Sequence, residues 1–168
     1  MRSQRRHRHL PHFSKPGASY LVSWSIVRGS PALTPTERDS VIETLRHFDG
    51  DRYRLHSAVV MNDHVHALLT PGPDHPLPRI LHTWKSYTAH EMVVAGRCSP
   101  VWNGNYFDQM IRDETHFANA GRYIERNPMV RWPGIQSYRW WISEPQDRSS
   151  RPADPSNDEL DPGPPGRD

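Results

Sequence analysis

Apolar and polar residues alternate or recur in short stretches between residues 20 and 126, and each stretch predicts one element. Stretches rich in β-branched and aromatic residues predict four strands, at about 20–28, 53–61, 64–70 and 101–111. Three other stretches predict helices, at about 35–48, 78–94 and 114–126. The order of these elements predicts an α+β fold, a ferredoxin-like sandwich in which helices cover one or both faces of an antiparallel sheet.

Local sequence signals predict where several of these elements begin and end. The sequence TPTE at 34–37 has the pattern of a capping box with proline at the first helical position. ND at 62–63 suits the two-residue turn of a hairpin, and Asp113 can cap the last helix. NP at 127–128 predicts the end of that helix, because a residue before proline disfavours helical backbone angles.

Composition divides the 168 residues into three parts. Residues 1–12 hold four arginines and three histidines and predict a flexible basic arm, of a kind that lies along nucleic acid or is merely solvated. Residues 13–143 contain the predicted elements and are expected to form one domain. Residues 144–168 hold six of the 17 prolines, seven acids and three arginines, so they predict a disordered acidic tail.

The net charge of +2 hides an uneven distribution, since residues 1–143 carry 18 basic and 12 acidic side chains. Arginine accounts for 19 of the 21 basic residues in the chain, and its planar fork suits phosphate well. A GC-rich genome would produce the same excess of arginine. The basic body therefore favours a polyanionic partner without establishing one.

Length, hydropathy and cysteine content exclude several classes of protein. The chain is too short for metal-dependent barrels, which need about 250 residues. With 35% hydrophobic and 24% charged residues, no stretch is apolar enough to span a bilayer, and no secretory signal is expected at the N-terminus. The single cysteine, Cys98, cannot form an internal disulfide, which favours a reducing cytoplasm.

The segment VVMNDHVHALL at 59–69 contains the most informative chemical signal. Side chains two apart on a strand share a face, so His64 and His66 project together while residues 65, 67 and 69 face a core. Two neighbouring imidazoles provide half of a divalent-metal site, although solvated or buried histidines would give the same pattern. Leucine at position 68 excludes a histidine-triad hydrolase, and the small number of predicted strands excludes a cupin.

The last predicted helix carries candidates that would complete such a site. Tyr123 and Asn127 are four residues apart and therefore lie on one face of the helix. The Asn127 amide oxygen is a plausible third ligand, and oxygen ligation suits Mg²⁺ or Mn²⁺. Tyr123 would stand one turn away as a nucleophile, with His116 as the candidate base. The alternatives are ordinary packing of a helical tyrosine and a helix end at Asn127.

Several short segments, in a fixed order, carry a family resemblance. They are LPH at 10–12, PGASY at 16–20, VVMNDHVHALLTP at 59–71, residues 81–89 with Lys85 and Ser86, VWNGNYFDQMIRDE at 101–114, YIERNP at 123–128 and SYRW at 137–140. Their order and spacing resemble the single-tyrosine HUH transposases, specifically the REP-associated tyrosine transposase branch. The resemblance covers roughly the whole chain apart from the acidic tail.

The resemblance implies a ferredoxin-like fold and cleavage of single-stranded DNA through a transient 5′-phosphotyrosine. By position, His64 and His66 match the metal ligands of the family, Tyr123 matches its nucleophile, and Asn127 matches the polar residue that completes the metal site. The implied cofactor is Mg²⁺ or Mn²⁺. The implied partner is single-stranded or hairpin DNA from repetitive extragenic palindromes, bound by a monomer or a homodimer in the cytoplasm, with the nucleoid. The alternative is a DNA- or RNA-hairpin-binding protein that has lost catalysis.

Several further residues bear on these expectations. Asn62-Asp63 stands where relatives often have Pro-Asn, and Gly121 inside the nucleophile helix costs about 1 kcal/mol against alanine. Tyr106 is the rival nucleophile, although it has no candidate ligand one turn away. The basic residues expected to contact DNA are Arg5, Arg6, Arg8, Lys85, Arg112 and Arg122.

Overall fold

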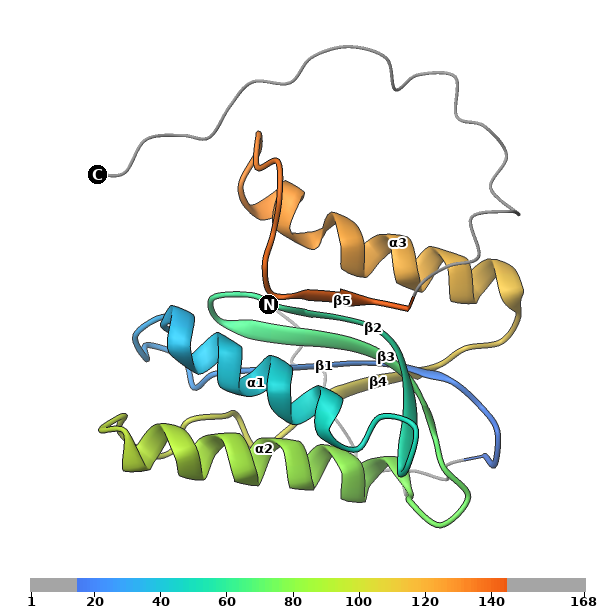
Figure 1. Ribbon diagram of the computed structural model, residues 1–168, viewed down its shortest axis with the longest axis horizontal. Coiled ribbons are helices and arrows are strands. Elements are labelled where there is room, and N and C mark those ends of the chain that lie inside the picture. The colour runs from blue at the N-terminus through green and yellow to red at the C-terminus, as the bar shows by residue number, and fades with distance from the viewer. Residues whose placement is uncertain (1–14, 145–168) are drawn as a thin grey trace, which may run out of the picture.

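The computed structural model describes residues 15–144, which fold into an α+β sandwich (Figure 1). In chain order the elements are β1 (Tyr20–Ser25), α1 (Pro35–His47), β2 (Tyr53–Val60), β3 (His64–Pro71), α2 (Leu77–Val94), β4 (Phe107–Met110), α3 (Glu114–Arg131) and β5 (Trp141–Ser143). The strands form one antiparallel sheet in the order β4-β1-β3-β2-β5. The predicted fold class is therefore confirmed.

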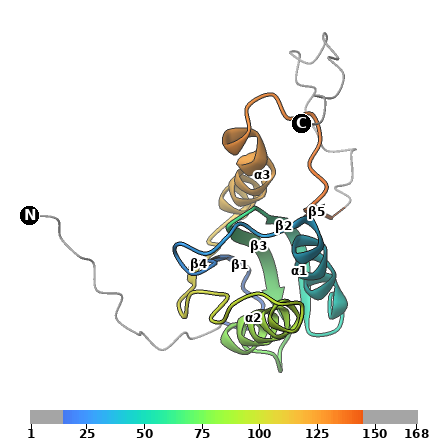
Figure 2. The ribbon, with the colours of Figure 1, turned by 90° about the vertical axis from the view of Figure 1, so that its left-hand side faces the viewer.

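The two faces of the sheet are covered by different helices. α1 and α2 pack together on one face, and α3 lies over the other (Figure 2). Because side chains alternate along each strand, one strand contributes to both layers. Trp24, Trp84 and Leu69 belong to the larger core beneath α1 and α2, whereas Leu68 and Ile124 belong to the smaller core beneath α3.

The predicted helix caps are present at the starts of α1 and α3. The Thr34 hydroxyl accepts a hydrogen bond from the Glu37 N–H at 3.3 Å, and the Glu37 carboxylate accepts one from the Thr34 N–H at 2.8 Å. At α3 the Asp113 carboxylate accepts a hydrogen bond from the His116 N–H at 2.7 Å. These bonds satisfy backbone donors that have no partner within their helices.

The predicted two-residue turn joins β2 to β3. The Met61 N–H donates to the His64 carbonyl across Asn62 and Asp63. The carbonyl of Asn62 accepts the Leu33 N–H at 2.7 Å, and that of Asp63 accepts the N–H of Ile26, the residue directly after β1, at 2.9 Å. The turn is therefore bound to the segment between β1 and α1, which fixes the position where β3 begins.

α3 is longer than predicted, and the prediction that NP at 127–128 ends this helix is wrong. The helix continues through Pro128 to Arg131. Proline lacks an N–H and crowds the carbonyl four residues earlier, so it weakens a helix at this point. Pro128 is nevertheless buried, and the following Trp132 packs against the smaller core while its N–H donates to the Pro128 carbonyl at 2.8 Å. Tertiary packing thus outweighs the local preference.

The sheet also differs from the prediction at its two edges. The strand expected over 101–111 is shorter, since β4 spans only Phe107–Met110. In the remaining part of the predicted strand, Trp102 forms an isolated bridge with Ile26, and the carbonyls of residues 103–105 accept hydrogen bonds from the Lys85 ammonium. β5 was not predicted, because three residues are too few to show an alternating pattern.

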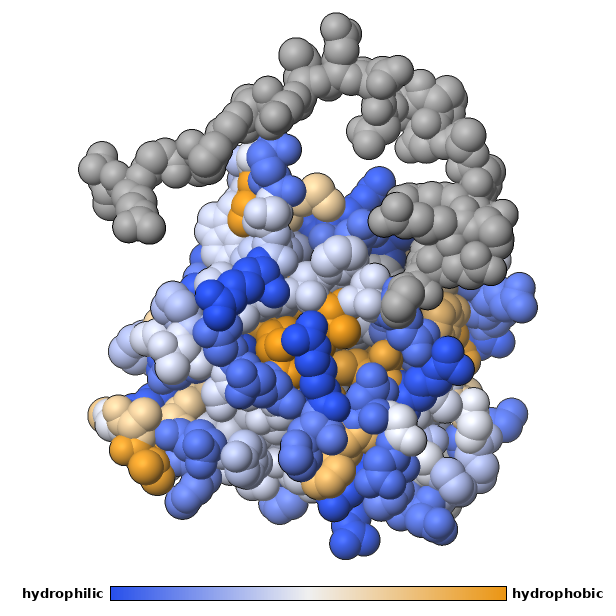
Figure 3. All heavy atoms as spheres, viewed as in Figure 1, coloured by the Kyte–Doolittle hydropathy of each residue, from blue (hydrophilic) through white to orange (hydrophobic). Residues whose placement is uncertain are grey.

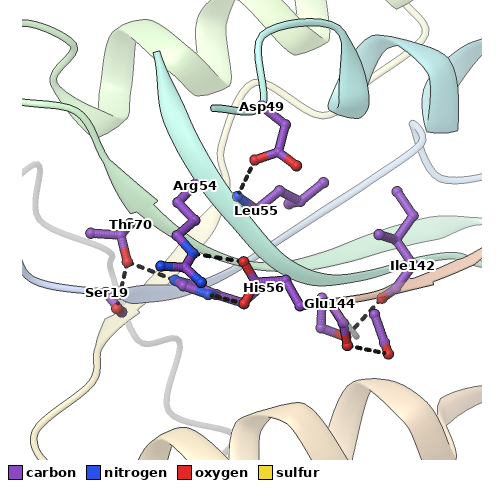
Figure 4. A network of polar contacts seen from close by, with 10 residues as sticks. Ser19, Asp49, Arg54, Leu55, His56, Thr70, Ile142 and Glu144 are labelled. Carbon is purple, nitrogen blue, oxygen red and sulfur yellow. Dashed lines mark hydrogen bonds and ion pairs between the residues drawn. The ribbon is translucent and has the colours of Figure 1, made fainter. Parts of the chain in front are cut away.

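A chain of polar contacts joins the end of β5 to the rest of the sheet (Figure 4). Glu144, expected to begin the acidic tail, accepts a hydrogen bond from Arg54 Nε at 2.7 Å and lies 3.0 Å from His56 Nδ1. His56 Nε2 lies 2.7 Å from Thr70 Oγ1, which lies 2.8 Å from Ser19 Oγ. The rest of the tail and the basic arm at 1–12 lie outside the described residues.

The surface is mainly hydrophilic, with an apolar area in the middle of the face seen in Figure 3, between α1 and α3. This area lies beside β5, on the opposite edge of the sheet from β4. Within residues 15–144, no helix combines the length and the apolar character needed to cross a membrane.

Candidate active site

His64 and His66 lie on the face of β3 that α3 covers. On the neighbouring strand β1, Ser25 is opposite His64 and Ser23 is opposite His66. The intervening Val65 points into the larger core on the other face. The two imidazole rings are neighbours, with centroids 4.8 Å apart and planes at 81°.

His64 is held between a carboxylate and an amide. Its Nδ1 lies 2.6 Å from the Asp63 carboxylate, and its Nε2 lies 3.4 Å from the Asn127 amide oxygen. A neutral ring that donates its Nδ1 proton to Asp63 presents a lone pair at Nε2. Two acceptor atoms, His64 Nε2 and Asn127 Oδ1, then face each other, an arrangement that suits a shared cation. A carboxylate on the far nitrogen is also the usual partner of a metal-binding histidine.

His66 is buried between His64 and Tyr123. Only 8% of the residue is exposed. Burial, and to a lesser extent the neighbouring His64, lowers the pKa of His66 to about 4. The ring is therefore neutral near pH 7, which is the protonation state that a metal ligand requires.

The atoms that meet here fit a divalent cation. Imidazole nitrogen suits first-row transition metals, and amide oxygen suits hard ions such as Mg²⁺ and Mn²⁺. Within residues 15–144, no group of three or more histidine, cysteine or acidic side chains is arranged to bind a metal. A cation at this position would therefore depend on Asn127 as the third protein ligand beside the two histidines.

Tyr123 lies next to the histidine pair on α3, one turn before Asn127. Its ring centroid is 5.1 Å from that of His66, with the two planes at 78°. The residue is 51% exposed. α3 holds Tyr123 in place through the buried Ile124 beneath it, so one side of the tyrosine ring meets His66 and the rest is accessible from solvent.

Tyr106 is not brought to this site. It packs against the larger core and lines a separate hollow beside α2, on the other side of the sheet from His66. Burial, with a contribution from Asp108, raises the pKa of Tyr106 to about 12. This phenol is therefore harder to deprotonate than an ordinary tyrosine, whose pKa is about 10.

His116 shares one pocket with His66 and Tyr123. Its Nδ1 accepts a hydrogen bond from the Arg112 N–H at 3.3 Å. In a neutral ring the other nitrogen then carries the proton. His116 would have to give up its bond with Arg112 before it could accept a proton from a nucleophile.

The basic residues expected to contact DNA have different surroundings. The Lys85 ammonium donates to the carbonyls of residues 103, 104 and 105, on the side of the sheet away from the histidines. Arg112 is exposed between β4 and α3, Arg122 is exposed in the middle of α3, and an Arg122 guanidinium N–H donates to Asn119 at 2.6 Å. The other three candidates, Arg5, Arg6 and Arg8, lie outside the described residues.

Asp63 is the member of this arrangement that the sequence analysis did not single out. The pattern around it predicts only a turn residue, yet its carboxylate makes the shortest contact of the site, with His64. An acidic residue directly before a His-x-His strand is a signal that could have identified it, because metal-binding histidines commonly donate to a carboxylate.

Comparisons with known proteins identify the family and the fold. Residues 31–127, more than half of the chain, match the family described as transposase IS200 like. The fold is similar to that of a REP-associated tyrosine transposase bound to a REP hairpin, with a TM-score of 0.61, 18% identity, and coverage of 79% of this chain and 75% of that chain. A Deinococcus radiodurans protein provisionally described as a transposase is 25% identical, covering 64% of this chain and 88% of that chain, with a TM-score of 0.49. None of the curated proteins compared matches the chain.

Proposed function

This protein belongs to the IS200-like transposase family, and we propose that it is a metal-dependent enzyme that cleaves and rejoins single-stranded DNA. The observation that carries the proposal is the meeting of α3 with β3. Tyr123 lies against His66, and Asn127 lies 3.4 Å from His64. All four residues fall within the stretch that matches the family.

The proposed reaction is a transesterification in which Tyr123 is the nucleophile. Its phenolic oxygen forms a bond to phosphorus, and the bond from phosphorus to the 3′ oxygen of the preceding nucleotide breaks. The phenol loses a proton and the departing 3′ oxygen gains one. The products are a free 3′-hydroxyl end and a 5′-phosphotyrosine. Because a phosphoester bond is retained, the reverse reaction can rejoin DNA without ATP.

The side chains around Tyr123 have distinct parts in this proposal. His64, His66 and Asn127 would hold Mg²⁺ or Mn²⁺, which supplies positive charge to offset that of the phosphate and to assist loss of the tyrosine proton. Asp63 keeps the His64 ring in one orientation through its 2.6 Å contact. Burial keeps His66 neutral and available.

The proposed substrate is a single-stranded, hairpin-forming DNA of the repetitive extragenic palindrome type. The structurally similar REP-associated transposase is described as bound to a REP hairpin, and the basic composition of residues 1–143 suits a polyanion. Such a substrate would place the protein with the nucleoid in the cytoplasm. Because the four site residues come from one chain, both a monomer and a homodimer are compatible with the proposal.

A cleavage assay on a 3′-labelled single-stranded hairpin tests this proposal. The label should become covalently attached to the protein in Mn²⁺ or Mg²⁺ and should not in EDTA. Tyr123→Phe should form no adduct, because the attacking oxygen is missing. Tyr106→Phe should still form it, since Tyr106 lies on the other side of the sheet.

Two results would contradict the proposal in different ways. An adduct that persists in Tyr123→Phe and disappears in Tyr106→Phe would contradict the assignment of the nucleophile. Hairpin binding without an adduct, in either metal, would contradict the enzymatic reaction and favour a binding protein that has lost catalysis. In that case, an RNA hairpin that competes equally with the DNA hairpin would show that the protein binds hairpins of either nucleic acid.

A further inference from the structure

An open pocket lies beside Tyr123 and His66 and is lined by residues of α3 and of strands β1, β3 and β4. It encloses about 350 Å³, within the range of sites that bind small molecules. Its walls include Phe107 and Gln109 of β4 and Asn119 of α3. None of these three residues has a part in the proposed transesterification.

Phe107 lies in the same row of the sheet as the site histidine. It is paired with Ser23 of β1, and Ser23 is paired with His66 of β3. Paired residues on neighbouring strands project from the same face and are about 4.5–5.5 Å apart. Phe107 is therefore on the α3 side of the sheet, with its Cβ about 10 Å from that of His66 across two strand spacings.

Phe107 exposes an aromatic ring on an edge strand. It is 54% exposed, and it belongs to neither of the two cores of residues 15–144. Tyr87 on α2 is also 54% exposed, but it lies on the other side of the sheet and lines no part of this pocket. The distinguishing property of Phe107 is thus its position beside Tyr123.

Amide groups accompany the Phe107 ring in the pocket. Gln109 is two residues further along β4 and therefore projects from the same face. Within residues 15–144, its side-chain amide has no hydrogen-bond partner. The Asn119 oxygen accepts a hydrogen bond from Arg122, which leaves the Asn119 amino group available. The pocket therefore offers a flat apolar surface together with free donors and an acceptor.

We infer that this pocket binds the nucleobase of one of the two nucleotides that flank the scissile phosphate, stacked on Phe107 and read by Gln109. The inference rests on the proposed function, which puts the phosphate at Tyr123. A phosphate at that position directs an adjoining nucleotide into the pocket that shares Tyr123 and His66 as walls. Aromatic rings stack on unpaired bases, and side-chain amides form paired hydrogen bonds with base edges, as glutamine does with adenine.

The test measures the affinity of a labelled hairpin that is abasic at one flanking nucleotide, using Tyr123→Phe so that no cleavage intervenes. Removing a stacked base or its aromatic partner should weaken binding about 5- to 150-fold. Phe107→Ala should bind the intact hairpin more weakly by this factor, at a fixed salt concentration. Tyr87→Ala, with equal exposure on the other side, should bind as tightly as the parent.

The decisive readout is the coupling between the ring and the base. At one of the two flanking positions, removal of the base should weaken hairpin binding by the Tyr123→Phe parent about 5- to 150-fold. The same removal should weaken binding by the Phe107→Ala variant of that parent less than twofold, because the stacking partner is already absent. Phe107→Tyr should restore both the affinity and the abasic penalty. Gln109→Ala should change the preference among the four bases at that position. Equal abasic penalties in the parent and in Phe107→Ala, at both positions, would overturn the inference.

Adduct formation by the wild-type protein, measured in parallel, separates this inference from the proposed function. An adduct without coupling between Phe107 and the base at either position would contradict the base pocket and would still support the proposed nuclease activity. Coupling without an adduct would support the pocket and contradict the nuclease. Failure of the Tyr123→Phe protein to bind any of the hairpins would contradict both.

Discussion

Replacing Asp63 with asparagine tests whether the histidine pair is built to bind a metal. Asp63→Asn keeps an oxygen that can accept the His64 Nδ1 proton but removes the negative charge that makes the 2.6 Å contact strong. Loss of a partner of this kind commonly lowers metal affinity about 10- to 100-fold. The Asp63 side chain is 53% exposed and so is partly screened, which places the expected loss near tenfold, or about 1.4 kcal/mol.

The assay is a titration of the full-length protein with Mn²⁺ at fixed pH, followed by calorimetry or by the electron paramagnetic resonance of free Mn²⁺. Asp74→Asn is the matched control, because it makes the same charge change at an exposed residue between β3 and α2. It should leave Mn²⁺ affinity within twofold of wild type. Asp63→Ala should bind Mn²⁺ more weakly than Asp63→Asn, since it also removes the oxygen that accepts the hydrogen bond from His64. Equal affinities for Asp63→Asn and wild type, or equal losses in both asparagine variants, would refute the orienting role of Asp63.

Three predictions concern stability. Arg97→Met should destabilise the domain by about 3 kcal/mol in urea unfolding, because it leaves the largely buried Glu37 carboxylate without its ion-pair partner. Arg139→Met, which removes an exposed ion pair, should cost under about 1 kcal/mol. Burial alone would raise the Glu37 pKa, but hydrogen bonds from Arg97 and from backbone lower it. The difference in unfolding free energy between wild type and Arg97→Met should therefore narrow as pH falls below about 4.5, because Glu37 becomes protonated. A difference that stays constant with pH would contradict this. Gly121→Ala should stabilise α3 by about 0.5–1 kcal/mol in thermal unfolding, since an added Cβ meets nothing within 4 Å; destabilisation would reveal an unseen clash. Ile124→Ala should cost about 2–5 kcal/mol in the same assay, and a loss under 1 kcal/mol would contradict its place in the core.

Local sequence was sufficient where one short signal determines one feature. The capping box at Thr34 and the turn at Asn62 and Asp63 involve neighbours in the chain, and both formed as predicted. The shared face of His64 and His66 follows from the alternation of side chains along any strand. In each case the geometry is fixed within a few residues.

Features that depend on distant partners could not be predicted in this way. The continuation of α3 through Pro128 depends on packing of that helix against the sheet, and β5 exists because it pairs with β2. The approach of Asn127 to His64 depends on the direction in which α3 crosses β3, which the i, i+4 spacing does not specify. The place of Phe107 beside the site depends in turn on the register of β4 against β1.

Mapping the covalent adduct to a single residue distinguishes Tyr123 from every other candidate nucleophile. The wild-type protein would be incubated with a single-stranded hairpin and Mn²⁺, digested with nuclease and protease, and examined by peptide mass spectrometry. A nucleotide is expected to be attached through its 5′-phosphate to the peptide that contains Tyr123, and this adduct is expected to be absent in EDTA. A nucleotide attached to Tyr106 or to any other residue would contradict the assignment of the active site to α3 and β3.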